Sequence, residues 1–91
     1  MRNFTIRGGE IDIIATEGHD VVFVEVKART NISYGSAMES ITPWKIQSLL
    51  KTAQFFLHQR GWEQKPCRFD LIAIDYYSGK PQIILEKNII D

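Results

Sequence analysis

The chain has 91 residues, 44% hydrophobic and 24% charged, which is enough apolar material for one small folded domain and excludes a disordered chain. Eleven Lys and Arg residues balance eleven Asp and Glu residues, which excludes nucleic-acid binding through bulk positive charge but not through a local basic patch. One cysteine, Cys67, excludes an intrachain disulfide and a multi-cysteine zinc site, and no apolar run approaches the roughly 18 residues of a membrane span, so we expect a cytoplasmic protein without a membrane partner.

The N-terminal third of the chain has the alternating, β-branched pattern of strands. Residues 4–6 alternate briefly and indicate the end of a strand. Residues 10–15 and 21–27 predict two longer strands, and the polar segment 17–20 between them has a length that is common in hairpins. We therefore expect an antiparallel pair of strands in this region.

A polar loop over residues 28–42 leads into the clearest helix of the sequence. Thr42 can cap the helix N-terminus, Pro43 suits the first helical position, and Gly61 suits the left-handed residue that follows a helix. Apolar residues recur at the spacing of one buried helix face, namely Ile46, Leu49, Leu50, Ala53, Phe56 and Leu57. The sequence thus predicts a helix over residues 43–60 with one face in the core.

Residues 69–75 and 82–86 predict two further strands, which complete the order β-β-α-β-β. A helix that links residues 21–27 to residues 69–75 is a crossover connection, which makes those two strands parallel. We therefore expect a single α/β domain, residues 1–91, built as a mixed sheet with a helix on one face. The other face is also apolar, and we expect another helix or a partner chain to cover it. Its apolar residues are Val22, Val24 and Val26.

The predicted hairpin contains acidic residues whose positions depend on its register. One register pairs Asp12 with Glu25. It also pairs Ile14 with Phe23, and so sets acid against acid and apolar against apolar. A slip by one residue would instead place Ile11 opposite Glu25, and the sequence leaves this second register open.

In the first register, two carboxylates lie side by side on a mostly apolar sheet. Neighbouring strands are about 4.8 Å apart, so ionised Asp12 and Glu25 would repel each other unless a divalent cation lay between them. Such oxygen ligands suit Mg²⁺ or Mn²⁺. Lys27 lies one pleat from Glu25 and could hold an attacking water or stabilise negative charge on a phosphate. A solvated acid–lysine pair on a strand has the same pattern, and both interpretations stay open.

Two runs in this region resemble the PD-(D/E)XK nuclease pattern, GEIDIIA at residues 9–15 and FVEVKAR at residues 23–29. The chain resembles most the YraN-like family of uncharacterised bacterial proteins, which are similar to archaeal Holliday-junction resolvases. The resemblance covers about residues 7–75. Shorter matches outside the two runs are Tyr34-Gly35, Lys45 and Arg68-Phe69-Asp70.

This resemblance implies a restriction-endonuclease-like fold and a metal-dependent endonuclease that hydrolyses DNA phosphodiester bonds. It implies branched or junction DNA, in repair or recombination, as the substrate and Mg²⁺ or Mn²⁺ as the cofactor. By motif position, Asp12 and Glu25 are the expected metal ligands together with the backbone carbonyl of Val26. Lys27 is the expected catalytic lysine, and Glu10, which belongs to the same motif, is expected to support the site.

Members of the family usually carry a helix, with one more acidic residue, before the position of Phe4. Only three residues precede Phe4 here, so we expect that helix to be missing from this chain. Arg29 and Lys45 are the expected phosphate contacts, because Arg29 follows the strand that carries Glu25 and Lys45 begins the helix. The segment 30–41 is the expected mobile flap.

Two other functions compete with the nuclease. The first is a nucleic-acid-binding module that keeps the fold without cleavage, which the neutral net charge and the short N-terminus favour. The second is a structural domain that associates through the uncovered sheet face or, as a homodimer, through the apolar edge strand at residues 82–86. We interpret Trp44 and Trp62 as residues buried at the two ends of the helix rather than as platforms for nucleobases.

Overall fold

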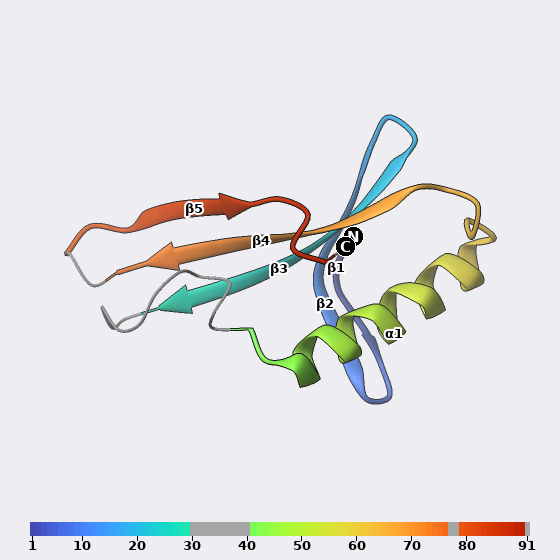
Figure 1. The fold of residues 1–91 in the computed structure, drawn as a ribbon, viewed down its shortest axis with the longest axis horizontal. Coiled ribbons are helices and arrows are strands. Elements are labelled where there is room, and N and C mark those ends of the chain that lie inside the picture. Colours follow the sequence, from blue (N-terminus) through green and yellow to red (C-terminus); the bar gives the residue numbers. More distant parts are fainter. Residues whose placement is uncertain (30–40, 77–78, 91) are drawn as a thin grey trace.

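The computed structural model describes residues 1–29, 41–76 and 79–90. Its elements are β1 (Arg2–Ile6), β2 (Gly9–Glu17), β3 (Asp20–Arg29), α1 (Pro43–Arg60), β4 (Cys67–Asp75) and β5 (Gln82–Glu86). The strands form one sheet in the order β1-β2-β3-β4-β5, in which β3 and β4 are parallel and the other neighbours antiparallel. Figure 1 shows α1, which links β3 to β4, lying against this sheet. The predicted mixed α/β sheet with a crossover helix is therefore confirmed.

The first strand is the main difference from the predicted order of elements. Phe4 pairs with Ile11 of β2, and Met1 exchanges two backbone hydrogen bonds of 2.8 Å with Ile14. Residues 4–6 are thus the end of a complete strand, and the order is β-β-β-α-β-β. The predicted order β-β-α-β-β is wrong because a run of three alternating residues does not reveal a strand whose pairing begins at Met1.

Strand β3 is longer than predicted and includes residues 28 and 29 of the expected loop. Arg29 is the last residue of β3 and lies opposite Asp75 of β4. Their side chains form an ion pair with 2.7 Å between Nε and Oδ1, which gives the strand end a partner. Of the expected flap at residues 30–41, Ile41 alone is described, and residues 30–40 lie outside the described residues.

The β2–β3 hairpin has the first of the two registers that the sequence allows. Ile14 pairs with Phe23, as that register requires. The connection is shorter than expected, because Glu17 and Asp20 pair with each other and leave two residues in the turn. Gly18 takes the first of these positions with a φ of 61°, a conformation that favours glycine.

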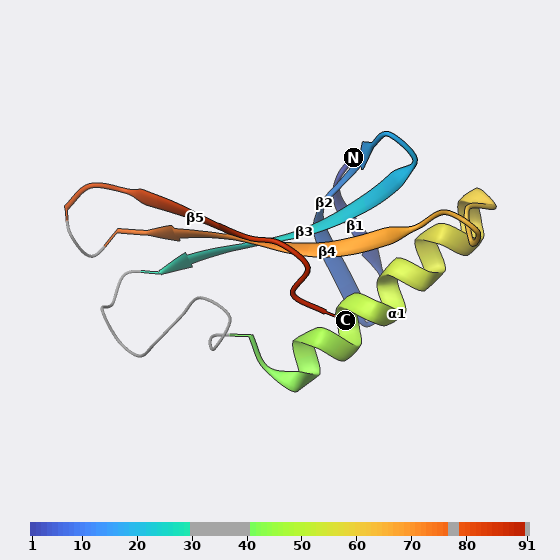
Figure 2. The same ribbon diagram turned by 45° about the horizontal axis from the view of Figure 1, so that its top comes forward.

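Strand β2 departs from strict alternation at the position of Asp12. Ile11 and Ile14 are three residues apart, yet both are buried in the same core cluster. The backbone pairing with β3 begins at Ile13, opposite Val24. Asp12 and the residues that precede it in β2 lie outside this pairing with β3. In Figures 1 and 2, the β1–β2 hairpin bends away from β3 and passes beside α1. This bend buries Ile11, which alternation alone assigns to the opposite face.

Helix α1 begins and ends as predicted. Thr42 accepts a 3.1 Å hydrogen bond from the Lys45 N–H, and Gly61 closes the helix in the left-handed conformation. The buried face contains Leu49, Thr52, Ala53, Phe56 and Leu57, which confirms the predicted stripe and adds Thr52, while Ile46 and Leu50 are half-buried.

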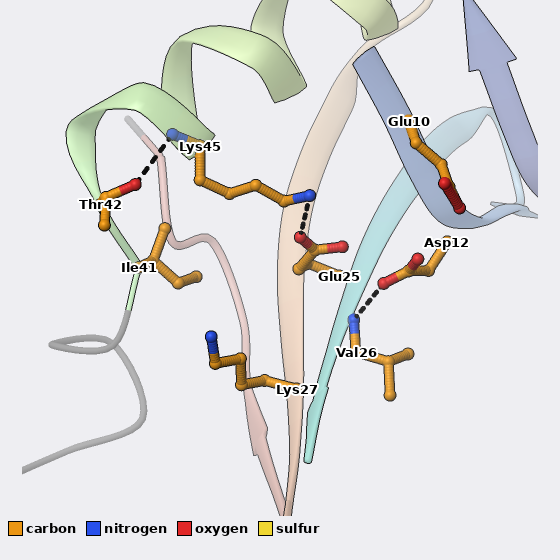
Figure 3. A pocket seen from close by; sticks show the side chains of 8 residues that line it. All are labelled: Glu10, Asp12, Glu25, Val26, Lys27, Ile41, Thr42 and Lys45. Carbon is orange, nitrogen blue, oxygen red and sulfur yellow. Dashed lines mark hydrogen bonds and ion pairs between the residues drawn. The ribbon is translucent and has the colours of Figure 1, made fainter. Parts of the chain in front are cut away.

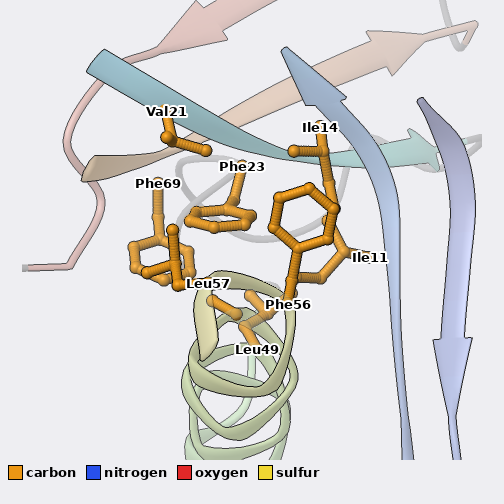
Figure 4. Packing of buried hydrophobic residues seen from close by; sticks show 9 residues of the cluster. Ile11, Ile14, Val21, Phe23, Leu49, Phe56, Leu57 and Phe69 are labelled. Atoms are coloured by element: carbon orange, nitrogen blue, oxygen red, sulfur yellow. The ribbon is translucent and has the colours of Figure 1, made fainter. Parts of the chain in front are cut away.

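The core between helix and sheet is aromatic. Phe23 stacks on Phe69 with 5.1 Å between ring centroids and meets Phe56 of α1 edge-on at 6.0 Å. Figure 4 shows these rings between the helix and strands β2 to β4, together with Ile11 and Ile14. Because the helix is held against β3 in this way, its first turn has a fixed position relative to Glu25.

The start of β2 touches α1 so closely that only glycine fits there. A Cβ atom at Gly9 would collide with Oγ1 of Thr52, which is fully buried and donates a 2.7 Å hydrogen bond to the Ser48 carbonyl. We expect Gly9→Ala to lower the free energy of unfolding by roughly 1–3 kcal/mol, as overpacking does. Chemical denaturation measures this change. The double variant Gly9→Ala/Thr52→Ala removes the colliding oxygen, and a double variant no more stable than the Gly9→Ala single variant would contradict the collision.

The sheet face that turns away from α1 is apolar across three strands. Val22 and Val24 on β3 are buried, and Val26 is half-buried. Strand register places Leu85 opposite Ile72 and Ile83 opposite Ile74, so the apolar face continues onto β5. No helix among the described residues covers this face. The described part of the chain also contains no helix that is long and apolar enough to cross a membrane. The expected covering helix or partner chain stays a prediction.

Candidate metal centre

A cavity of about 430 Å³ opens between the first turn of α1 and the strands β2 and β3. It is lined by Glu10, Asp12, Glu25, Val26, Lys27, Ile41, Thr42 and Lys45 (Figure 3). It therefore brings together every residue that the sequence analysis assigned to catalysis or metal binding, and one of the two expected phosphate contacts.

Glu25 is the most buried carboxylate of the cavity. Its side chain is 8% exposed, and its Oε2 lies 2.7 Å from Nζ of Lys45. Its Oε1 is buried and has no hydrogen-bond partner among the described residues. A buried carboxylate oxygen without a donor costs free energy, so this atom indicates a missing partner.

Asp12 is held at the point where β2 leaves β3. Its Oδ2 accepts a 2.9 Å hydrogen bond from the Val26 N–H, a bond from side chain to backbone that stands where the backbone ladder has ended. The bend in β2 thus directs this carboxylate toward β3, beside Glu25, in the cavity (Figure 3).

The two carboxyl groups hold protons differently. Burial, and then the neighbouring Asp12, raises the pKa of Glu25 to about 7, although Lys45 opposes this shift. Burial also acts to raise the pKa of Asp12, but the neighbouring Glu25 and the hydrogen bond from the Val26 N–H outweigh it and leave this pKa below its ordinary value. Below about pH 7, Glu25 therefore keeps its proton beside ionised Asp12, as one of two closely placed carboxylates does.

Lys27 and Glu10 line the cavity from its exposed side. Lys27 lies on the same face of β3 as Glu25 and is exposed to solvent, and no hydrogen bond or ion pair joins it to another described residue. Glu10 is exposed as well. In the described part of the chain, no three His, Cys, Asp or Glu side chains converge on one point, so Glu10 does not form a triad with Asp12 and Glu25.

Arg29 lies apart from the cavity. Its Nε and Nη2 each donate a 2.7 Å hydrogen bond to Asp75, whose side chain is fully buried. The hydrogen bonds from Arg29 lower the pKa of Asp75. This bidentate pair joins the ends of the two parallel strands, and the phosphate contact expected of Arg29 stays a prediction. Asp75 ends the predicted strand 69–75, and pairing the ends of the two parallel strands would have pointed to it.

Two features of the helix start were not foreseen. The ion pair between Lys45 and Glu25 assigns Lys45 a contact with an acid, where the sequence analysis expected a phosphate contact. Trp44 is 85% exposed, so its predicted burial is wrong, because the helix begins beyond the edge of the core cluster. Trp62 is half-buried and packs edge-on against Phe56 at 5.9 Å, as expected.

The donor set of the cavity fits a hard divalent cation. Two carboxylates and the backbone of Val26 supply oxygen atoms, and Mg²⁺ characteristically binds one or two protein carboxylates and completes its shell with water. The unpartnered Oε1 of Glu25 is the observation that supports this fit. Asp12, Glu25 and Val26 are the residues that would hold the ion.

Comparison with known proteins supports the resemblance seen in the sequence. A model of the uncharacterised protein family UPF0102 matches residues 1–74, which include every residue of the cavity. A UPF0102 protein of Pseudomonas paraeruginosa is 40% identical over 93 aligned positions, which cover 99% of this chain and 74% of the relative. UPF0102 proteins of Stutzerimonas stutzeri and Hahella chejuensis are 47% and 48% identical, over 80% and 79% of this chain and 62% and 58% of their own lengths. The chain therefore belongs to protein family UPF0102, the YraN-like family that its two acidic strands resemble.

Proposed function

We propose that this protein is a metal-dependent endonuclease that hydrolyses DNA phosphodiester bonds, with branched or junction DNA as its substrate. The observation that carries the proposal is the buried Oε1 of Glu25, which has no partner among the described residues and lies beside Asp12 in an open cavity. A cation between the two carboxyl groups would satisfy this oxygen and remove the repulsion within the pair.

The residues of the cavity divide the work of hydrolysis. Asp12, Glu25 and the Val26 carbonyl would hold Mg²⁺ or Mn²⁺, and the bound ion would supply an activated water and neutralise charge on the phosphate. Lys27, exposed at the cavity one pleat from Glu25, would orient the attacking water or contact the phosphate. Glu10 would act from the exposed side of the cavity, where it can orient water.

A cleavage assay tests the proposal directly. Labelled four-way junction, flap, single-stranded and duplex DNA are each incubated with the chain in Mg²⁺, in Mn²⁺ and in excess chelator. We expect the two metals to give products that the chelator abolishes, with branched DNA cut fastest. If none of these substrates is cut in either metal, the nuclease proposal for this chain is wrong.

A DNA-binding module without cleavage is the second candidate. It is favoured by the Lys45–Glu25 ion pair, which leaves the buried acid partly neutralised in the protein itself. The variant Trp62→Phe makes exposed Trp44, next to Lys45, the sole tryptophan, so its fluorescence reports DNA at the first turn of α1. Binding that persists in Glu25→Gln, together with an inactive parent protein, would favour this candidate.

A homodimer is the third candidate, and strand β5 is the surface that favours it. β5 is an edge strand, and on it Ile83 is 73% exposed and Leu85 53% exposed. Unpaired edges with apolar side chains are surfaces on which a second strand can pair. Sedimentation equilibrium of the parent chain and of Ile83→Lys tests this candidate, and a parent chain that stays monomeric would exclude it.

A further inference from the structure

The ammonium group of Lys45 contacts Glu25, so a cation that bound Glu25 would have to share this carboxylate with Lys45. Lys45 belongs to the first turn of α1, and its backbone N–H is fixed by the Thr42 hydroxyl. From there its side chain crosses the cavity to reach Oε2 of Glu25 at 2.7 Å (Figure 3). The Lys45 side chain is still 39% exposed, so it has room to leave this position.

Charge balance explains why this lysine is present. Once both carboxylates are ionised, as a bound cation requires, they and the Lys45 ammonium carry a net charge of −1, whereas adding a divalent cation beside the same ammonium would give +1. Like charges a few ångströms apart repel strongly in a partly buried site. A cation and the Lys45 ammonium therefore compete for Glu25.

We propose that Lys45 is an internal counter-ion of the metal site: it neutralises Glu25 in the metal-free protein and is released from Glu25 when a divalent cation binds. This inference rests on the proposed function. The released ammonium, on a flexible four-carbon stem beside the cavity, then becomes available to a phosphate of the substrate. The first turn of α1 would thus couple occupancy of the metal site to binding of the DNA backbone.

Lys27 is the natural control for this role. It lines the same cavity and carries the same charge, but no ion pair joins it to a described residue. Removing Lys27 changes the field of the cavity without freeing an oxygen of Glu25. A difference between the two lysine variants therefore measures the competition for Glu25 rather than the loss of one positive charge.

Calorimetric titration of the protein with Ca²⁺ and Mn²⁺, without DNA, tests the inference independently of cleavage. Removing the competing ammonium should let Lys45→Met bind the metals at least about tenfold more tightly than the parent. Lys27→Met, which removes an exposed charge, should stay within about threefold of it. Lys45→Arg should bind more weakly than the parent, because a guanidinium pairs with a carboxylate through two hydrogen bonds.

The outcomes separate this inference from the proposed function. Equal metal affinities in the parent, Lys45→Met and Lys27→Met would overturn the counter-ion role while leaving the metal site intact. Metal binding that is absent from all three proteins would overturn the metal site itself. If Lys45→Met fails to fold, the comparison of the parent with Lys45→Arg decides, and tighter binding by Lys45→Arg would contradict the inference.

Discussion

Replacing Glu25 with glutamine is expected to abolish metal binding and to lower DNA cleavage by about 10³-fold or more, the scale on which a site loses its activated water or its stabilisation of charge. The substitution keeps the shape of the side chain but removes the negative charge that a divalent cation requires. It also leaves an amide group in place of the unpartnered Oε1. Calorimetry with Mn²⁺ and a cleavage assay on branched DNA measure the two effects.

Glu86 offers a matched control for this substitution. It is a half-exposed glutamate on the neighbouring part of the same sheet, opposite Leu71, and it does not line the cavity. Glu86→Gln makes the same chemical change and is expected to leave metal affinity and cleavage close to those of the parent. If the Glu25→Gln variant still cleaves DNA, Glu25 is not part of the catalytic site.

Stability should fall as the pH rises from about 5 to 8, because Glu25 holds its proton more tightly in the folded chain. Its pKa is raised from 4.5 to about 7. The resulting stabilisation is complete below the unfolded pKa and is lost as the pH passes through the folded one. At about 1.4 kcal/mol for each pKa unit, the loss has an upper limit of about 3.5 kcal/mol. Asp12, whose pKa is lowered, is ionised throughout this range in both states.

Denaturant unfolding at several pH values in the absence of divalent metal measures this loss. The informative quantity is the difference between the parent and Glu25→Gln, since groups remote from Glu25 titrate alike in both proteins. The parent should lose stability relative to the variant as the pH rises. If the two stability curves run parallel from pH 5 to 8, the proton is not held by Glu25.

The strands and the helix could be predicted because their signals are local. Thr42, Pro43 and Gly61 mark the helix ends through backbone chemistry that needs no tertiary contact. Matching Ile14 with Phe23 favoured the register that the β2–β3 hairpin adopts, although the sequence left a slip by one residue open. The same register predicted that the two acids of the candidate site, Asp12 and Glu25, lie side by side.

The features that the sequence did not predict depend on a bend in a strand and on contacts between residues that are far apart in the chain. The bend that buries Ile11 arises where β2 leaves β3, and no residue type marks it. The contact of Lys45 with Glu25 depends on how far the helix start lies from the sheet, which the aromatic core sets. The ion pair of Arg29 with Asp75 was not predicted, because Asp75 comes 46 residues later in the chain.

The hydrogen bond from Val26 to Asp12 limits how Asp12 can act as a ligand. The Val26 N–H occupies one lone pair of Asp12 Oδ2, which favours binding of a cation through one oxygen of this carboxylate over bidentate binding through both. A near-octahedral ion would then take most of its shell from water and substrate. We therefore expect a site that binds free metal weakly and binds it tightly only with a phosphate present, so that the ion and the DNA enter as one cooperative unit.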